Sequence, residues 1–307
     1  SSSARLESIR MSTPLILEGL GGKVTAITGF EKGSGKTTFL SLALPHARRV
    51  GPVAVFTIGV DGRLKADRGA STDIRVEPGD VVMTTEAFAR ASEARLEVLD
   101  TIPGRTALGR LFLGRARRAG SVTLVGSEHL SALDGAVERV RAEGWASSVL
   151  IDGAVNRITQ VSALSDVQFV FTVQADRSNL ARAAARVRAV AAMADLPLDD
   201  GSEAPAGLEA NRVHRIDGPL TAETLQALPS GLQCISVAEF TKIFLEPKDL
   251  LRAMSRVRIE VRRRLPLLGF VVTLRDVRCE AFTELAGTDA ASRTFFNPWA
   301  PHAGSAA

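Results

Sequence analysis

Short apolar runs alternate along this chain with longer segments of helical period, and that alternation limits what the chain can fold into. The runs are rich in valine, leucine and isoleucine, and turn residues separate them from the helical segments. A continuous apolar run of about four to eight residues is typical of a strand covered on both faces, as in a mostly parallel sheet flanked by helices. We therefore predict a three-layer α/β fold. Strands are predicted over residues 23–28, 52–58, 122–125, 148–151, 168–173, 234–237 and 269–274.

The segments between these strands carry helical patterns of apolar residues. We predict helices over residues 37–47, 85–99, 130–143, 179–194 and 247–264. The last of these ends in a basic run, which is typical of a solvated helix face. Its members are Arg256, Arg258, Arg262, Arg263 and Arg264.

The first predicted strand and the first predicted helix are joined by a glycine-rich loop, TGFEKGSGKTT at residues 28–38. A strand, a loop of this kind and a helix in this order predict a P-loop, whose backbone N–H groups cradle phosphates. Lys36 would place its charge at the β and γ phosphates, and the Thr37 hydroxyl would coordinate Mg²⁺. The predicted nucleotide-binding residues are Lys32, Gly33, Ser34, Gly35, Lys36, Thr37 and Thr38.

The loop departs from the pattern GxxxxGK[ST] in its first half. The glycine expected five residues before Gly35 is Phe30, and Gly29 stands one position earlier. The half that faces the phosphates, GSGKTT, is complete. We expect Gly29 to make the exit turn from the strand one residue sooner.

Two carboxylates complete the predicted site. The run SSVLID, residues 147–152, is an apolar strand that ends in Asp152, the form of a Walker B segment, and Asp152 would hold Mg²⁺ together with Thr37. Asp61 follows the second strand and would contact Mg²⁺ or orient the attacking water, although a turn aspartate before Gly62 is an equal alternative. The predicted catalytic residues are therefore Lys36, Asp61 and Asp152.

The base of the nucleotide is less constrained than its phosphates. The [NT]KxD motif typical of guanine-selective proteins does not occur, so ATP is favoured over GTP as the partner of Mg²⁺. These residues predict a Mg²⁺-dependent nucleoside triphosphatase with its nucleotide at the carboxyl edge of the sheet.

Composition limits the compartment and the partners. The two cysteines, Cys234 and Cys279, stand far apart, which fits a reducing cytoplasm. No apolar run reaches the roughly 20 residues that cross a bilayer, so no membrane partner is expected. The net charge of +4 comes from bases and acids spread along the chain, which argues against nucleic acid as the partner.

The chain is predicted to divide into four parts. Residues 1–10 are predicted to be a leader or an expression remnant, and residues 11–200 a nucleotide-binding domain. Residues 201–296 form a smaller C-terminal α/β portion, separated by LPLDDGSEAPAG, which has the composition of a linker. Residues 297–307 are predicted to be a flexible tail.

The chain contains, in this order, KGSGKTT at 32–38, TIGVDGR at 57–63, VEPGDVVMTT at 76–85, TALGRLFLGRARRAGSVTLVG at 106–126, LIDGAVNR at 150–157 and FTKIFL at 240–245. These segments resemble the lysine 5,6-aminomutase reactivase family, whose members are P-loop chaperones of an adenosylcobalamin-dependent enzyme. The resemblance implies an ATPase whose turnover exchanges damaged cobalamin of an adenosylcobalamin-dependent aminomutase for fresh coenzyme. Phe30 and residues 269–297 depart from the family pattern.

Two other functions use the same loop and stay open at this point. One is an ATP-dependent ligase or kinase of the dethiobiotin-synthetase-like group, whose turnover would rise with one metabolite. The other is a nucleic-acid-stimulated ATPase, whose binding to DNA or RNA would depend strongly on salt.

Overall fold

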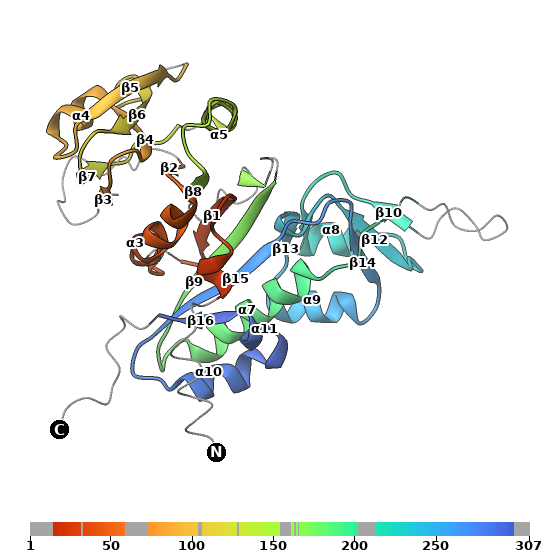
Figure 1. Ribbon diagram of the computed structural model, residues 1–307. Helices are drawn as coiled ribbons and strands as arrows, with labels where there is room; N and C mark the ends of the chain where they lie inside the picture. The colour runs from red at the N-terminus through yellow and green to blue at the C-terminus, as the bar shows by residue number, and fades with distance from the viewer. Residues whose placement is uncertain are drawn as a thin grey trace, which may run out of the picture. The chain divides into compact units, whose positions relative to one another are not determined.

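The computed structural model describes residues 15–31, 33–58, 73–103, 106–127, 129–153, 161–162, 164, 166–199, 201 and 213–297. It is an α/β fold with a large, mostly parallel sheet (Figure 1). The chain forms two compact units, Ser1–Thr172 and Val173–Ala307. The division falls inside strand β9 (Val167–Ala175), earlier in the chain than the boundary that linker composition predicts near residue 200.

The first unit is built on a sheet with the strand order β9-β1-β8-β2-β4-β6-β5. Strands β9 to β4 run parallel to one another, and β6 and β5 are antiparallel additions. The parallel strands are buried along their length because helices and loops cover both faces, as their continuous apolar sequences predict. The bounds are β1 (Val24–Gly29), β8 (Ser148–Asp152), β2 (Val53–Thr57), β4 (Val81–Thr85), β6 (Leu111–Ala116) and β5 (Leu96–Thr101).

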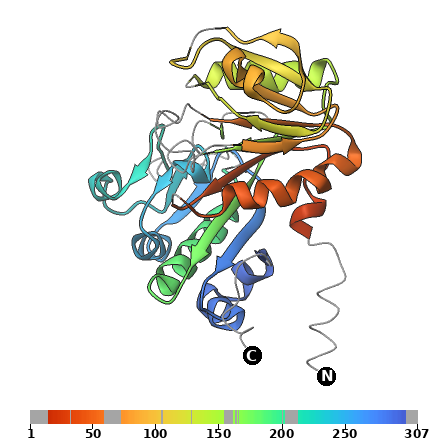
Figure 2. The same ribbon diagram turned by 90° about the vertical axis from the view of Figure 1, so that its left-hand side faces the viewer.

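Helix α3 (Lys36–Ala47) follows β1 and lies against the parallel strands (Figure 2). Its buried side chains, which include Phe39, Leu40 and Leu44, recur at helical spacing and hold it on the sheet. The remaining elements of this unit are α2 (Leu15–Glu18), η1 (Arg48–Val50), α4 (Glu86–Ala91), α5 (Leu130–Ala142) and an antiparallel pair formed by β3 (Asp73–Val76) and β7 (Gly120–Thr123).

The predicted helix over residues 85–99 is wrong beyond its first turns. Helix α4 ends at Ala91, and the chain then continues into β5, which pairs with β6. Ser92 stops the helix because its hydroxyl donates to Ser121 O at 2.8 Å and accepts from Ala94 N at 3.0 Å. A tertiary contact to β7 thus overrides the local helical pattern.

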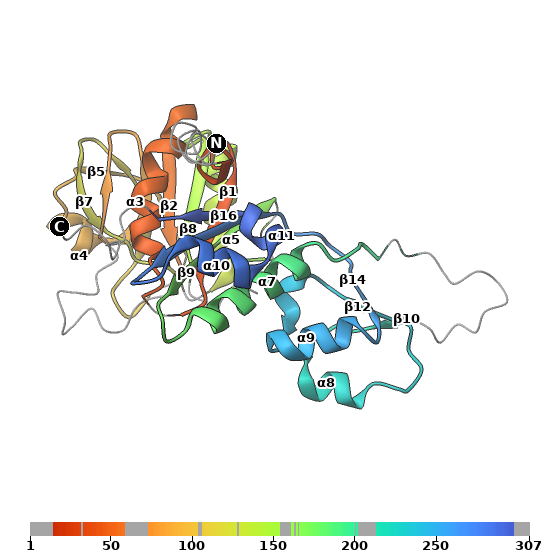
Figure 3. The ribbon, with the colours of Figure 1, turned by 90° about the horizontal axis from the view of Figure 1, so that it is seen from below.

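The second unit contains a small parallel sheet, β10-β12-β14, with two helices on one of its faces (Figure 3). Those helices, α8 and α9, precede β12 and β14 in the chain. A separate group, α10 and α11, packs on α7. The bounds are α7 (Leu180–Ala194), β10 (Val213–Arg215), β11 (Leu220–Thr221), α8 (Ala222–Ala227), β12 (Cys234–Val237), η3 (Phe240–Lys242), β13 (Ile243–Phe244), α9 (Pro247–Met254), β14 (Arg258–Val261), β15 (Leu267–Leu274), α10 (Cys279–Ala286), α11 (Thr288–Ser292) and β16 (Thr294–Phe296).

The predicted helix over residues 247–264 is also wrong in its second half. Helix α9 ends at Met254, and β14 follows with buried Ile259 and Val261 alternating with more exposed Arg258 and Glu260. The basic run therefore spans the turn before β14, the strand and its exit, and the expectation of a solvated helix face is wrong. An alternation of period two is typical of a strand. Strand β14 pairs in parallel with β12.

The segments predicted as a linker and as a tail both begin with residues that bond to neighbouring strands. Asp199 N donates to Val261 O at 2.8 Å, so the start of the predicted linker runs beside β14. Asn297, the first residue of the predicted tail, is buried and its N–H donates to Val272 O at 2.8 Å. Residues 298–307 and 1–14 lie outside the described residues.

Among the helices that the structure describes, none has both the length and the apolar character needed to span a bilayer.

Candidate functional site

The candidate site lies where the parallel strands of the first unit end. Asp152, the last residue of β8, pairs in register with Ile27 of β1 on one side and with Thr57 of β2 on the other. Its carbonyl oxygen accepts from Ile58 N at 3.1 Å, and Gly153 N donates to Ile27 O at 2.9 Å. These backbone bonds hold Asp152 at the carboxyl edge of the sheet, next to the strand that leads into the glycine-rich loop.

The loop between β1 and α3 turns through two glycines with positive φ, 79° at Gly33 and 90° at Gly35. Glycine is favoured at both because this region of φ strains other residues. Gly35 is also the N-cap of α3 and offers no side chain to the first amides of the helix. Those amides, together with the positive end of the helix dipole, suit an anion.

Three predicted ligand residues begin α3. Lys36 is its first residue and is half-buried, whereas Thr37 and Thr38 in the same turn are exposed. Lys36 and the two threonines therefore lie at the N-terminus of α3, directly after the loop. A P-loop has its lysine and its threonine at this place.

Ser34 is placed differently from the prediction, because its side chain turns into the protein. It is only 3% exposed, and its Oγ shares a 2.8 Å hydrogen bond with Thr172 Oγ1 of β9. Thr172 Oγ1 also donates to Thr28 O at 3.2 Å. Ser34 can thus offer a ligand only its backbone, and its side chain anchors the loop.

This anchor explains the displaced glycine of the motif. A Cβ at Gly29 would collide with Ser34 Oγ and would lie 2.8 Å from Thr172 Oγ1. Only glycine leaves room for the inward serine, so Gly29 serves close approach. Phe30, which replaces the expected glycine, packs its ring 5.5 Å from that of Phe171 and fastens the start of the loop to β9.

The side chain of Asp152 is the least satisfied carboxylate of this edge. It is 7% exposed, and its Oδ1 has no hydrogen-bond partner among the described residues. Burial raises the pKa of Asp152 from 3.8 to about 6, and the nearby charge of Lys36 opposes that rise. The structure therefore brings Lys36 and Asp152 within electrostatic reach of each other, and no described residue bonds one oxygen of the carboxylate.

Two further polar atoms at the ends of parallel strands escaped the sequence analysis. Thr28 Oγ1 on β1 and Thr85 Oγ1 on β4 are buried and have no hydrogen-bond partner in the described part of the chain. Buried polar atoms are usually bonded, so these two need a partner that the described residues do not supply, such as an ordered water or an ion. The available signal was a threonine at the end of an apolar run, as in VVMTT.

The structure does not place every predicted site residue. Lys32 and Asp61 lie outside the described residues, so their roles stay predictions. In the segment VEPGD, Asp80 accepts from Arg48 Nη2 at 2.6 Å and from Glu77 N at 2.8 Å. Asp80 thereby joins the start of β4 to the end of α3, which is a structural task.

Comparisons of this chain with protein-family models, with curated proteins and with solved structures found no match.

Proposed function

We propose that this chain is a Mg²⁺-dependent P-loop nucleoside triphosphatase. The single observation that carries the proposal is the pair formed by Lys36 on the loop and Asp152 at the end of β8, whose buried carboxylate has an oxygen with no hydrogen-bond partner among the described residues. An unpaired buried carboxylate costs folding free energy, and a metal ion would remove that cost.

The phosphates would lie over the loop. Amides of residues 33–38 and the N-terminus of α3 supply donors, and Lys36 supplies a full positive charge. A triphosphate satisfies all of these groups at once, whereas a neutral ligand would leave the lysine and the helix end without a counter-charge.

The metal would be held by Asp152 and the exposed Thr37 hydroxyl. Mg²⁺ prefers oxygen ligands and is commonly bound through one or two carboxylates together with phosphates of the substrate. Bound Mg²⁺ would neutralise charge on the transferred phosphoryl group. Asp61 remains our candidate for orienting water, and ATP our candidate nucleotide, because the guanine-selective motif is missing from the sequence.

We further propose that turnover serves a protein partner, an adenosylcobalamin-dependent aminomutase, from which the protein would release damaged coenzyme. The support is the order of short segments that resemble the reactivase family. Phosphate release should rise on addition of a holo-aminomutase. A rise with one metabolite alone would favour the ligase or kinase alternative, and a salt-sensitive rise with DNA would favour the nucleic-acid alternative.

Calorimetry with Mg²⁺-ATP tests the site itself. Lys36→Ala should weaken binding by about 10- to 100-fold, because hydrogen bonds to charged groups contribute about 1.5–3 kcal/mol. Lys23→Ala is the matched control, since Lys23 is exposed and precedes β1 at the opposite end of that strand. Equal affinity for both variants would refute the assignment of Lys36.

A further inference from the structure

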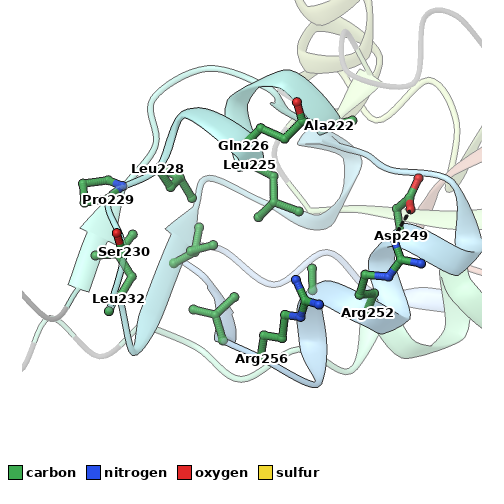
Figure 4. A pocket seen from close by; sticks show the side chains of 14 residues that line it. Ala222, Leu225, Gln226, Leu228, Pro229, Ser230, Leu232, Asp249, Arg252 and Arg256 are labelled. Atoms are coloured by element: carbon green, nitrogen blue, oxygen red, sulfur yellow. Dashed lines mark ion pairs between the residues drawn. The ribbon is translucent and has the colours of Figure 1, made fainter.

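The second unit contains a pocket of about 610 Å³ between α8 and α9 (Figure 4). Its floor includes Ile235 of β12, and the turn that joins α8 to β12 closes one end. Leu225, Leu228, Leu232 and Val257 give the pocket an apolar wall. This volume lies within the range of about 300–1,000 Å³ that is usual for small-molecule sites.

Charge is unevenly distributed around the pocket. Arg252 and Arg256 lie along one side, across from Leu225 (Figure 4). Arg252 meets Asp249 at 3.7 Å, and the two side chains are 55% and 42% exposed. The Arg256 guanidinium has no hydrogen bond or ion pair with any residue that the structure describes. Two guanidinium groups against one carboxylate leave a net charge of +1 at the pocket.

The C-terminal end of α9 reduces this charge but does not cancel it, and the two ends of α8, at Ala222 and at the turn after Ala227, both lie at the pocket with opposite partial charges. Helix α9 ends at Met254, and its last carbonyls contribute a partial negative charge of about one half. The two guanidinium groups carry full charges, and only one formal negative charge opposes them. A ligand with one negative group is therefore favoured over a cation.

We propose that this pocket binds a small organic carboxylate with an apolar body, with Arg256 as the residue that recognises the carboxylate. Guanidinium and carboxylate match in a bidentate pair, and the leucine-lined wall removes the apolar body from water. The site is separate from the candidate nucleotide site and does not depend on it.

A small molecule fits this pocket better than a segment of a partner protein. The exposed apolar side chains of α9, Leu251 and Met254, are not among the residues that line it. The apolar surface of the pocket therefore does not continue along the helix, and a bound segment would have little more to cover.

Calorimetry on the full chain with hexanoate, octanoate and decanoate tests the proposal. We expect measurable binding that tightens with chain length, because each added methylene buries more apolar surface. Arg256→Gln should weaken octanoate binding about tenfold or more, since a charge-assisted hydrogen bond is lost. Arg278→Gln is the matched control, because Arg278 belongs to the same unit, is 86% exposed and lies outside the pocket.

One further measurement tests the contribution of the carboxylate to binding separately from that of the apolar body. Another tests whether octanoate binds independently of the nucleotide site. Octan-1-ol should bind the wild type more weakly than octanoate does. The two ligands should bind Arg256→Gln with equal affinity. Lys36→Ala should bind octanoate as the wild type does. The proposal is overturned if no member of the series binds, if octan-1-ol matches octanoate in the wild type, or if Arg278→Gln loses as much affinity as Arg256→Gln.

Discussion

Each unit of this protein has a parallel sheet with charged residues at its carboxyl ends, and the hydrogen bonding of those residues differs between the two sheets. In the first unit, Asp152 ends β8 with a carboxylate oxygen that no described residue bonds. In the second, Asp199 accepts from Ser236 Oγ at 2.6 Å, and Glu239 accepts from Arg263 Nη2 at 2.6 Å. Among the described residues, similar strand ends thus hold one carboxylate with an unbonded oxygen and two whose oxygens accept hydrogen bonds within the fold.

The pKa shifts follow the same division. Hydrogen bonds from Arg215 and Ser236 lower the pKa of Asp199 well below its ordinary value, so its ionised form is favoured in the folded protein. Burial raises the pKa of Asp152 to about 6, so ionising it opposes folding. We expect three substitutions to test this contrast.

The largest effect should come from a bonded carboxylate in the first unit, Asp80. Asp80→Ala would leave Arg48 and the buried amide of Val53 without their acceptor, and should lower the free energy of unfolding by about 3–5 kcal/mol. Urea denaturation measures the change. Glu77→Ala is the control, because Glu77 meets Arg75 only at 3.9 Å on the surface and should matter little. A small loss for Asp80→Ala would mean that pairing does not distinguish Asp80 from Asp152.

Asp152→Asn should raise the free energy of unfolding, whereas Asp80→Ala should lower it. Its raised pKa means that the folded state holds the proton more tightly than the unfolded state, so stability falls as pH rises from 3.8 to about 6 and stays low above that. A difference of about 2 pH units corresponds to about 3 kcal/mol. The variant should therefore be more stable than the wild type by up to that amount at about pH 7.5, and the difference should vanish towards about pH 4.

The matched control is Glu138→Gln, an exposed position on α5, which should change stability little at either pH. The same Asp152→Asn protein should lose the Mg²⁺ dependence of nucleotide binding. A variant that is less stable at neutral pH would show that the carboxylate is satisfied within the fold, and the reason to place a metal there would disappear.

The smallest effect should come from Asp199→Asn, which removes the negative charge that accepts hydrogen bonds from Arg215 and Ser236 in the second unit. Because its folded pKa is lowered, Asp199 stabilises the fold above the ordinary carboxyl range, near pH 4, and this contribution is lost as pH falls. The variant should lose about 1–2 kcal/mol at about pH 7, with less difference from the wild type at about pH 3. Thermal melts at the two pH values measure it. Asp217→Asn, whose side chain is fully exposed, should melt as the wild type does.

Much of the candidate site could be predicted because its parts are local. The apolar run of β1, the glycines of the loop and the start of α3 lie within one continuous segment, and each has its own sequence signal. Asp152 could be predicted because it ends an apolar strand. The inward turn of Ser34 could not, since its partner, Thr172, stands 138 positions away in the chain.

The two wrongly predicted helices also show that local sequence patterns do not specify contacts between distant segments. The patterns at 85–99 and 247–264 are compatible with a helix when only near neighbours are considered. What ended α4 was a bond between Ser92 and Ser121, and what drew residues 258–261 into a strand was pairing with β12. Strand pairing depends on distant segments, so local periodicity does not specify it.

The amino-acid sequence by itself determined the alternation of buried strands with helices and the glycine-rich turn that precedes Lys36, because backbone preference and apolar periodicity act over a few residues. Only the tertiary structure decided which carboxylate is free and which is bonded. Asp152, Asp80 and Asp199 are the same residue type, and they differ in the neighbours that folding brings together. Asp152 has a nearby lysine and, in the part of the chain that the structure describes, no donor to one oxygen, whereas Asp80 and Asp199 accept hydrogen bonds.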